Sequence, residues 1–380
     1  MNGNNDTRSL GFFVYKKEET LCYSGKEEGI GRIANTLSKT IAYERTPSLF
    51  DEKEIEDRDM ELRQLQELKQ ADRALCIDRR NKPVVLSSYQ SRIIYALSYA
   101  LSQDMESEDI KKKIQAPTKK GNNVKRFVNI TALTSLIFGS TRKRCKEIII
   151  KEIYNLVRIR QVQILGTGDN KVKLTAPLIN MGYTMEDLSP EKRNNLDLIE
   201  IEFGSAFFYG LNNRFAVITP KLFRVWGKSG RGTDLFDKLL SSILSVYWFH
   251  RQAANKAEDR VSQDRGNKKL SKAELQEAIT EARRNAMTYE LNVSSIKKKV
   301  TTDYSSQRAY KAKFYKDLQN AIDGFKELDL ITDCVIHKGA KDQEKVIFIL
   351  SESYNFMEKQ EENSTPLLED KTDDNEPSAF

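Results

Sequence analysis

Histidine and cysteine are scarce in this chain of 380 residues. The two histidines, His250 and His337, each lack a second His, Cys or carboxylate cluster at the spacing that metal ligands require. The cysteines, at positions 22, 76, 145 and 334, are too scattered for a disulfide framework or a zinc site. The sequence therefore predicts neither a metal site nor a cofactor.

Motifs of known catalytic sites are also missing. His250 is followed by Arg251, Gln252 and Ala253, so it does not begin a His-x-x-Arg box. No His-hydrophobic-His pair is present. Gly227-Lys228-Ser229 matches the end of a phosphate-binding loop, but Leu222 occupies the position of the partner glycine. No Gly-x-Ser-x-Gly or paired-carboxylate motif occurs. We therefore expect a binding protein rather than an enzyme.

Long apolar runs are absent as well. No stretch approaches the roughly 18 consecutive apolar residues of a membrane-spanning helix. The apolar run near the N-terminus, Gly11–Tyr15, is five residues long and leads directly into charged residues, which is unlike a secretory signal. The sequence predicts a cytoplasmic protein without membrane contact.

Charge is present in quantity and is unevenly distributed. The net charge is +7, but residues 81–230 hold 24 Lys and Arg against 13 Asp and Glu, a net of +11. Residues 356–380 hold 2 against 8, a net of −6. A basic body beside an acidic tail is typical of nucleic-acid binders, because polyanion binding depends on clustered positive charge. The same pattern is compatible with a merely soluble protein.

The C-terminal half predicts an ordered series of elements. A short helix over Asn292–Val300 precedes a longer helix over Ser305–Leu328, and strands over Leu330–Ile336 and Lys345–Leu350 follow as a hairpin. The long helix has one apolar stripe, made of Tyr310, Phe314, Leu318, Ala321 and Phe325. Its opposite face carries Arg308, Ala309, Ala312, Lys313, Lys316 and Gln319. Two helices followed by a hairpin is the order of a winged helix-turn-helix, whose second helix enters the DNA major groove.

Residues 83–228 repeat this order. Helices are predicted over Ser88–Gln103, Ile130–Phe138 and a third segment that Ser140 or Thr141 caps and that ends near Val157. Alternating residues around Val162–Ile164 and Val172–Leu174 predict a hairpin, and residues 111–127 predict a Lys-rich loop. The outward face of the third helix carries Lys143, Arg144, Glu147, Lys151 and Tyr154.

The segment that joins the two series has its own pattern. Asp234–Asn255 predicts a helix that is apolar on nearly all sides and is therefore buried. Residues 256–269 predict a polar, mobile segment, and Ser271 with Glu274 predicts a capping box for a helix to Ala286. Ser48 to about Leu75 predicts a charged helix.

These elements predict a helix-rich α+β fold with two winged helix-turn-helix domains in tandem. The expected divisions are an N-terminal extension with a charged helix over 1–80, the first winged-helix domain over 81–228, the second over 229–355 and a disordered acidic tail over 356–380.

The series of elements resembles the tandem winged-helix replication initiators of plasmids and mobile elements, the Rep or RepB-like family. The likeness is strongest over Tyr289–Ile322 and recurs more weakly over Leu86–Leu101 and Asn129–Leu156. The resemblance implies a protein without catalytic activity that binds repeats at a replication origin on double-stranded DNA and helps to open adjacent AT-rich DNA. It also implies recruitment of a host initiator and the replicative helicase, and repression of its own promoter as a homodimer.

The resemblance also implies roles for individual residues. Direct readout of bases would come from Arg308, Lys313, Lys316 and Gln319, with Ala309 or Ala312 against a thymine methyl group. Lys143, Arg144 and Lys151 would add contacts from the first domain. The residues of the two hairpins would hold phosphates, and these are Lys171, Lys173, Lys338 and Lys341.

Two other functions fit the same pattern. A winged-helix transcriptional regulator of a mobile element would share the fold and the DNA contacts. A scaffold built of winged helices would instead bind protein partners through the same helices. Salt separates the scaffold from the DNA binders, because affinity for duplex DNA falls steeply with salt when counterions are released.

Overall fold

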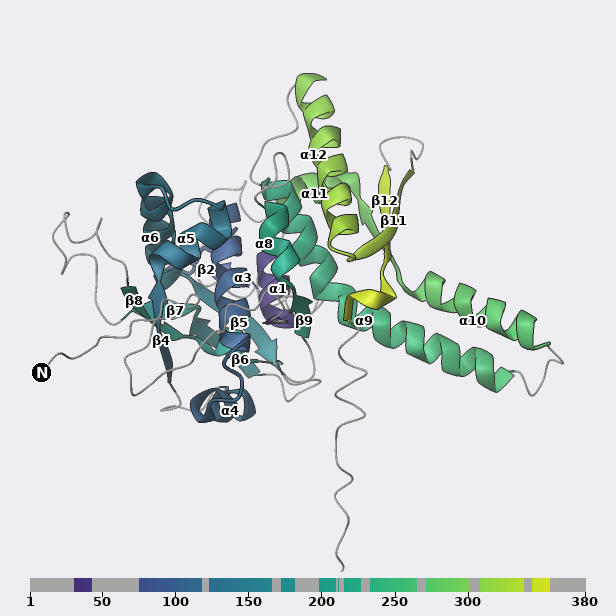
Figure 1. Ribbon diagram of the computed structural model, residues 1–380, viewed down its shortest axis with the longest axis horizontal. Helices are drawn as coiled ribbons and strands as arrows, with labels where there is room; N and C mark the ends of the chain where they lie inside the picture. The colour runs from purple at the N-terminus through teal and green to yellow at the C-terminus, as the bar shows by residue number, and fades with distance from the viewer. Residues whose placement is uncertain are drawn as a thin grey trace, which may run out of the picture.

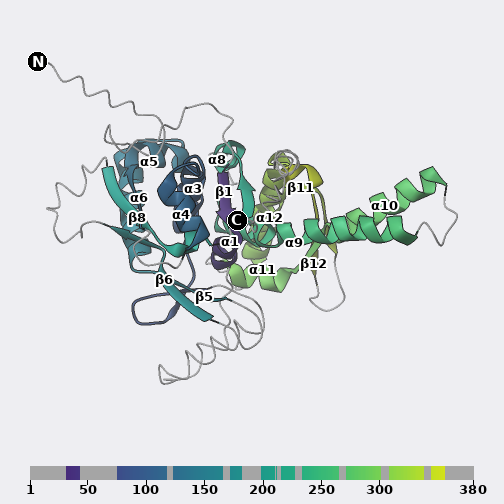
Figure 2. The same ribbon diagram turned by 90° about the horizontal axis from the view of Figure 1, so that it is seen from below.

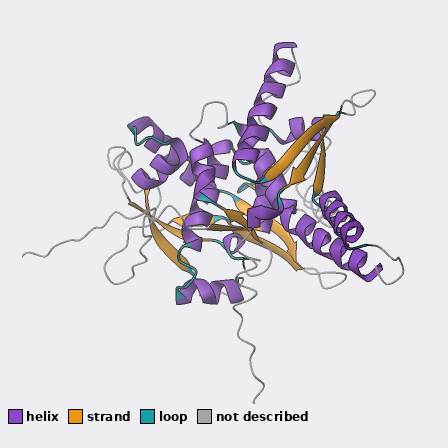
Figure 3. Cartoon of the chain, turned by 45° about the vertical axis from the view of Figure 1, so that its right-hand side comes forward, coloured by secondary structure: helices purple, strands orange, loops and turns teal. Residues whose placement is uncertain are grey.

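The chain folds into a helix-rich α+β structure with small antiparallel sheets (Figures 1 and 3). The computed structural model describes residues 31–42, 75–117, 123–165, 172–181, 198–209, 211, 215–226, 233–264, 271–300, 308–337 and 344–355. The predicted fold class is confirmed at this level. The tail over 356–380 lies outside the described residues. So does the helix predicted from Ser48, except for its last residue, Leu75, which begins a strand.

The first half is organised around three helices. These are α3 (Ser88–Ser102), α5 (Ile130–Phe138) and α6 (Lys143–Val157). Ser87 begins α3 with a capping box, and the Asn129 side chain accepts a hydrogen bond from the Ala132 amide at the start of α5. Gly139 ends α5 with φ of 62°, a left-handed conformation that glycine adopts without strain. All three helices lie where the sequence predicted them.

The predicted Lys-rich loop over 111–127 is partly wrong. Helix α4 (Glu108–Gln115) and strand β4 (Val124–Asn129) occupy most of it. Ile110 and Ile114 bury one side of α4 in the core. The Arg126 guanidinium forms salt bridges with Asp104 at 2.5 Å and with Asp109 at 2.7 Å, which fastens β4 to α4 and to the turn before it.

Three small sheets accompany these helices in the described part of this half. The strands are β1 (Gly31–Ala34), β2 (Leu75–Ile77), β3 (Pro83–Val84), β5 (Arg160–Leu165), β6 (Val172–Pro177), β7 (Ile179–Met181), β8 (Leu198–Phe203) and β9 (Phe215–Ile218). The predicted hairpin is formed by β5 and β6, and the sheet continues in the order β3-β2-β5-β6. β8 lies between β4 and β7, and β1 pairs with β9. These pairings join segments that are far apart in the chain.

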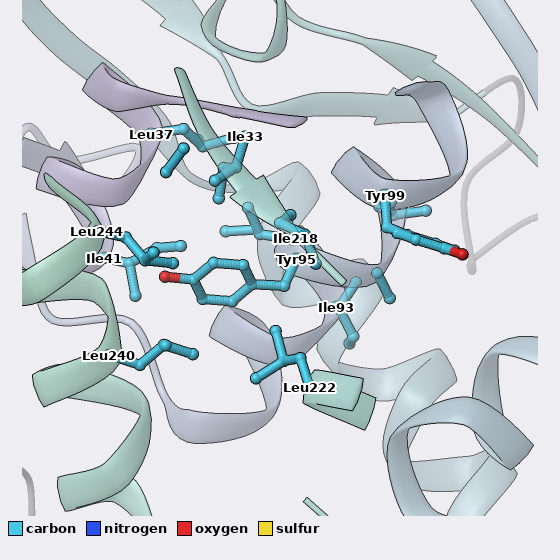
Figure 4. Close-up of a cluster of buried hydrophobic side chains, with 14 of the residues drawn as sticks. Ile33, Leu37, Ile41, Ile93, Tyr95, Tyr99, Ile218, Leu222, Leu240 and Leu244 are labelled. Carbon is cyan, nitrogen blue, oxygen red and sulfur yellow. The ribbon is translucent and has the colours of Figure 1, made fainter. Parts of the chain in front are cut away.

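Helix α9 (Asp234–Asp264) crosses the molecule and is longer than predicted. Its first half packs against α1 (Asn35–Ile41) and α3, as Figure 4 shows for Leu240 and Leu244 beside Tyr95. Each of these three side chains is at most 1% exposed. Residues of α8 (Pro220–Trp226) belong to the same hydrophobic core. The burial that the sequence predicted for this helix is confirmed for its first half.

The buried half of α9 also carries charged and polar groups that its apolar pattern concealed. Asp237 is 0% exposed and forms a salt bridge with Arg92 of α3 at 2.9 Å. The Lys238 ammonium, 1% exposed, donates hydrogen bonds to the Leu86 and Ile41 carbonyl oxygens at 2.7 and 3.0 Å. Tyr95 and Ser241 share a hydrogen bond of 2.7 Å. Polar contacts therefore fix α9 to the first half of the chain.

The second half of α9 pairs with α10 (Lys272–Ala286) to form a two-helix arm (Figure 1). The predicted capping box of Ser271 and Glu274 is confirmed. The prediction of a mobile segment over 256–269 is wrong for its first part, because α9 continues to Asp264. The Arg283 guanidinium holds the base of the arm through salt bridges with Glu258 and, at 2.6 Å, with Glu352.

The last elements follow the predicted order. They are β10 (Thr288–Asn292), α11 (Val293–Lys299), α12 (Arg308–Glu327), β11 (Ile331–His337) and β12 (Lys345–Leu350). The three strands form one sheet in the order β10-β12-β11. Phe314, Leu318, Ala321 and Phe325 are each 0% exposed, which confirms the apolar stripe of α12 at these four positions. The Phe325 ring lies 4.9 Å from that of Phe236, so α12 packs on α9.

Candidate nucleic-acid interface

Helix α6 presents the basic face that the sequence predicted. Ile149, Ile153 and Leu156 are each 0% exposed and face the core, where α6 contacts α3 and α5. Lys143, Arg144 and Lys151 are exposed. Among the described residues, no carboxylate oxygen lies within 4 Å of the side-chain nitrogens of these three cations. Their charges are therefore available to an external anion.

The N-terminus of α6 is unusually basic. The predicted caps, Ser140 or Thr141, are wrong, because the N-cap residue is Arg142, whose side chain makes no capping hydrogen bond. The Ser140 hydroxyl accepts a hydrogen bond from the Arg142 amide at 3.3 Å, one residue before the helix begins. The first turn has no acidic residue, although the helix dipole favours negative charge at this end. Lys143 and Arg144 therefore stand where cations destabilise an isolated helix. A bound phosphate would accept hydrogen bonds from the free amides of the first turn and would balance the positive charge of these side chains.

Helix α12 presents the second predicted face. Ala312, Lys313, Lys316 and Gln319 are exposed, on the side opposite to the buried stripe. Lys313 has a weak ion pair with Asp317 at 3.9 Å, whereas Lys316 has no carboxylate within ion-pair distance in the described part of the chain. Ala312 leaves room for close approach beside Lys313 and Lys316.

Acidic residues limit the basic part of α12 to its N-terminal half. The Gln319 side-chain amide donates a hydrogen bond to the Asp323 carboxylate at 2.9 Å. Gln319 must leave this partner before it can read a base in the way the sequence predicted. Asp323 is exposed, so its charge would repel a phosphate. We therefore place any contact of α12 with a duplex near Ala312 and Lys316.

Two contacts hold α12 in position. The Lys297 ammonium of α11 lies 5.1 Å from the centre of the Phe314 ring, in a cation–π contact. The Tyr315 hydroxyl donates a hydrogen bond to Glu344, the residue before β12. Desolvation and the Glu344 carboxylate raise the pKa of Tyr315 to about 12, so its hydroxyl remains a donor at neutral pH. The helix is thus attached both to α11 and to the hairpin.

The remaining predicted contacts are located only in part. Arg308 and Ala309 begin α12, and their side chains lie outside the described part of the structure. Lys173 lies in β6 opposite Ile164, again without a described side chain. The hairpin-tip residues Lys171, Lys338 and Lys341 lie outside the described residues altogether. Their assignment to phosphate contacts stays a prediction.

The two basic helices lie on the same side of the molecule. In Figure 1, α6 is at the upper left and α12 rises at the top. The arm of α9 and α10 extends in another direction, and Figure 2 shows its far end well away from α6. A duplex that contacts α6 and α12 would therefore leave the arm free.

The sequence interpretation overlooked one group of exposed cations. Arg79, Arg80 and Lys82 lie in the turn between β2 and β3. The signal was present, because Asp78 and Asn81 are residues that favour tight turns. The surrounding strands are too short for periodicity to reveal them.

The described part of the chain contains neither a candidate metal cluster nor a candidate membrane-spanning helix. There, no group of three or more His, Cys, Asp and Glu residues is placed to hold a metal ion. None of the described helices has the length and hydropathy needed to cross a membrane. Comparison of the chain with protein-family models, curated proteins and solved structures finds no match.

Proposed function

We propose that this chain binds double-stranded DNA sequence-specifically and initiates replication of a plasmid or mobile element from repeats at its origin. In this proposal the chain has two winged-helix units, α6 and α12 face the major groove, and the chain catalyses no reaction itself. Host initiation proteins and the replicative helicase are the expected partners, and a homodimer is the expected repressor form.

One observation carries the proposal. Two helices in separate parts of the chain each bury an apolar stripe, expose basic side chains on the opposite face and lie on one side of the molecule. Among the described residues, Lys316 of α12 and Lys143, Arg144 and Lys151 of α6 have no carboxylate within ion-pair distance. Cations that gather on a solvated surface repel one another, so exposed basic faces on two separate helices favour a polyanionic partner.

The order of strands gives further support in the second unit. β10 precedes the helix pair α11 and α12, the hairpin of β11 and β12 follows it, and β12 pairs with β10. The pairing of β12 with β10 joins the hairpin to the strand that leads into the helix pair, which supports the winged helix-turn-helix proposed for this unit. The first unit departs from this arrangement, because β4 pairs with β8 and the β5–β6 hairpin instead joins β2.

A mobility-shift assay with the DNA that flanks the gene for this chain tests the proposal. We expect a shift by full-length protein whose Kd rises steeply between about 50 and 200 mM salt. In a footprint of the same DNA, protection of direct repeats beside AT-rich DNA would support initiation. Protection of a single inverted repeat would support the transcriptional regulator instead, and an affinity that does not change with salt would support the protein scaffold.

Replacing Lys316 by alanine tests the readout by α12. We expect specific affinity to fall by about 1–3 kcal/mol, with preference relaxed at one base position, because Lys316 is exposed and has no ion pair among the described residues. Anisotropy titration against wild-type and base-substituted duplexes measures both effects. Lys272→Ala, an exposed lysine of α10, is the control, and equal effects of the two substitutions would remove Lys316 from the interface.

Deleting residues 358–380 tests the role of the acidic tail. The deletion removes eight acidic and two basic side chains, a net of six negative charges. We expect tighter binding to duplexes of unrelated sequence, because less negative charge repels the phosphates. Thermal unfolding should be unchanged. A lower Tm would show that the tail stabilises the folded chain.

A further inference from the structure

The turn between β2 and β3 is closed by its own hydrogen bonds and carries three exposed cations. We define the basic turn as Asp78–Lys82. Its backbone is closed by hydrogen bonds from the Asp78 amide to the Lys82 carbonyl oxygen at 2.9 Å and from the Asn81 amide to the Asp78 carbonyl oxygen at 3.1 Å. Asn81 has φ of 61°, the left-handed conformation that asparagine tolerates. The conformation of the turn is therefore defined by its own residues.

The only carboxylate of the basic turn is turned toward the backbone. An Asp78 carboxylate oxygen accepts hydrogen bonds from the Arg80 amide at 2.7 Å and from the Lys82 amide at 2.9 Å. Arg79, Arg80 and Lys82 are exposed, and in the described part of the chain none has a carboxylate oxygen within 4 Å of its side-chain nitrogens. The turn thus presents three cations while its single anion shapes the loop.

The basic turn is anchored beside the end of α6. Arg160, which begins β5 three residues after α6 ends, pairs with Ile77 across the sheet. Its guanidinium donates hydrogen bonds to the Asn81 side-chain oxygen at 2.7 Å and to the Asp78 carbonyl oxygen at 3.4 Å. Arg158, the C-cap residue of α6, is also exposed. The turn and the C-cap of α6 therefore each carry exposed cations, and Arg160, two residues after that C-cap, is bonded to the turn.

We infer that the basic turn is a phosphate-binding clamp that contacts the backbone of the duplex beyond the C-terminal end of α6. The inference rests on the proposed function and extends its interface to residues 79–82. Three adjacent cations on an ordered turn repel one another in the free protein, and a phosphate backbone relieves that repulsion. Because the turn is already ordered, little backbone entropy is lost on binding. Contacts of this kind position a protein without reading its sequence.

Salt dependence tests this inference directly. Each phosphate that a cation neutralises adds about 0.9 to the slope of log Kd against log salt, so three contacts add roughly 2.7. We therefore expect Arg79→Gln/Arg80→Gln/Lys82→Gln to lower the slope by about 2 to 3 and to weaken binding roughly tenfold or more at low salt. The probe is a fluorescent duplex of arbitrary sequence and about 30 base pairs, or three helical turns, titrated with full-length protein.

A charge-matched variant separates local contact from net charge. Lys256→Gln/Arg260→Gln/Lys272→Gln also removes three exposed cations, but from the arm of α9 and α10. It should leave the slope within about 0.5 of wild type, since its cations contact no phosphate. Both variants should keep the wild-type Tm, because Asp78 and Asn81, which shape the turn, are retained.

The outcomes separate this inference from the proposed function. If wild-type protein binds duplex DNA and loses affinity in Lys316→Ala, but the turn variant keeps the wild-type slope, the clamp is refuted alone. If the turn variant and the arm variant lower the slope of log Kd against log salt equally, the clamp is also refuted, because the loss of net charge then explains the effect. If wild-type protein binds no duplex, both the proposed function and the clamp are refuted.

Discussion

Replacing Arg144 and Lys316 together by alanine is expected to weaken specific duplex binding by about 2–6 kcal/mol, or at least about 30-fold in Kd. Each residue contributes about 1–3 kcal/mol if it contacts the duplex. The two residues belong to different helices, α6 and α12, and share no contact partner among the described residues. Their effects should therefore add when both helices engage one duplex.

Anisotropy titration of wild type, both single variants and the double variant measures this additivity. Lys256→Ala/Lys272→Ala provides a control that also removes two exposed cations, from the arm. If the double variant has the same Kd as the single variant with the higher Kd, then α6 and α12 do not contact one duplex at the same time. Such a result would mean that only one of the two helices lies against the DNA.

Replacing Arg92 by methionine is expected to cost about 3–5 kcal/mol of unfolding free energy. Asp237 is 0% exposed, and its described partners are the Arg92 guanidinium at 2.9 Å and the Ser88 hydroxyl. Without Arg92 the carboxylate stays buried without a countercharge. The guanidinium also lies over the Trp226 ring at 5.2 Å, so the substitution removes a second contact. Chemical denaturation of full-length protein measures the loss.

The pH dependence of this variant has a definite sign. Burial raises the pKa of Asp237 above its ordinary range, and the charge of Arg92 opposes that effect. Removing Arg92 raises the pKa further. Between the ordinary pKa and the raised one, the folded chain holds a proton that the unfolded chain has lost, so stability falls as pH rises. The destabilisation should therefore be smaller near pH 5 than near pH 8. The change is expected between the ordinary pKa of aspartate, about 4, and the raised pKa of Asp237.

A second substitution provides the control for the buried pair. Arg92→Met/Asp237→Leu removes both charges, and apolar replacement of a whole buried pair is often neutral. The double variant should regain much of the lost stability and lose the pH dependence. If Arg92→Met alone cost less than about 1 kcal/mol, the pair would not be a main attachment between α3 and α9.

The elements of the second unit could be predicted because their signals are local. In α12, Phe314, Leu318 and Phe325 recur at the helical period, and the capping box of α10 is readable from Ser271 and Glu274 alone. The exposed face of α12 followed from the same periodicity. What periodicity could not show is that Gln319 is engaged by Asp323, because that depends on side-chain conformation.

The parts that sequence reasoning missed depend on distant partners. β1 becomes a strand through pairing with β9, and β4 through pairing with β8, which local patterns do not encode. In the sequence, Asp237 and Lys238 interrupt an apolar helix without an evident partner. The structure supplies Arg92 for Asp237, and the carbonyl oxygens of Ile41 and Leu86 for Lys238. The basic turn escaped notice for the same reason, since β2 and β3 are only three and two residues long.

Selection of binding sites from a random duplex library tests the central claim most directly. Full-length wild-type protein should enrich one defined sequence, and Lys316→Ala should enrich the same sequence with the preference lost at one base position. Such a result would place α12 in the groove of a duplex that the chain reads. Failure of the wild-type protein to enrich any sequence, or an identical sequence from both proteins, would contradict readout by this helix.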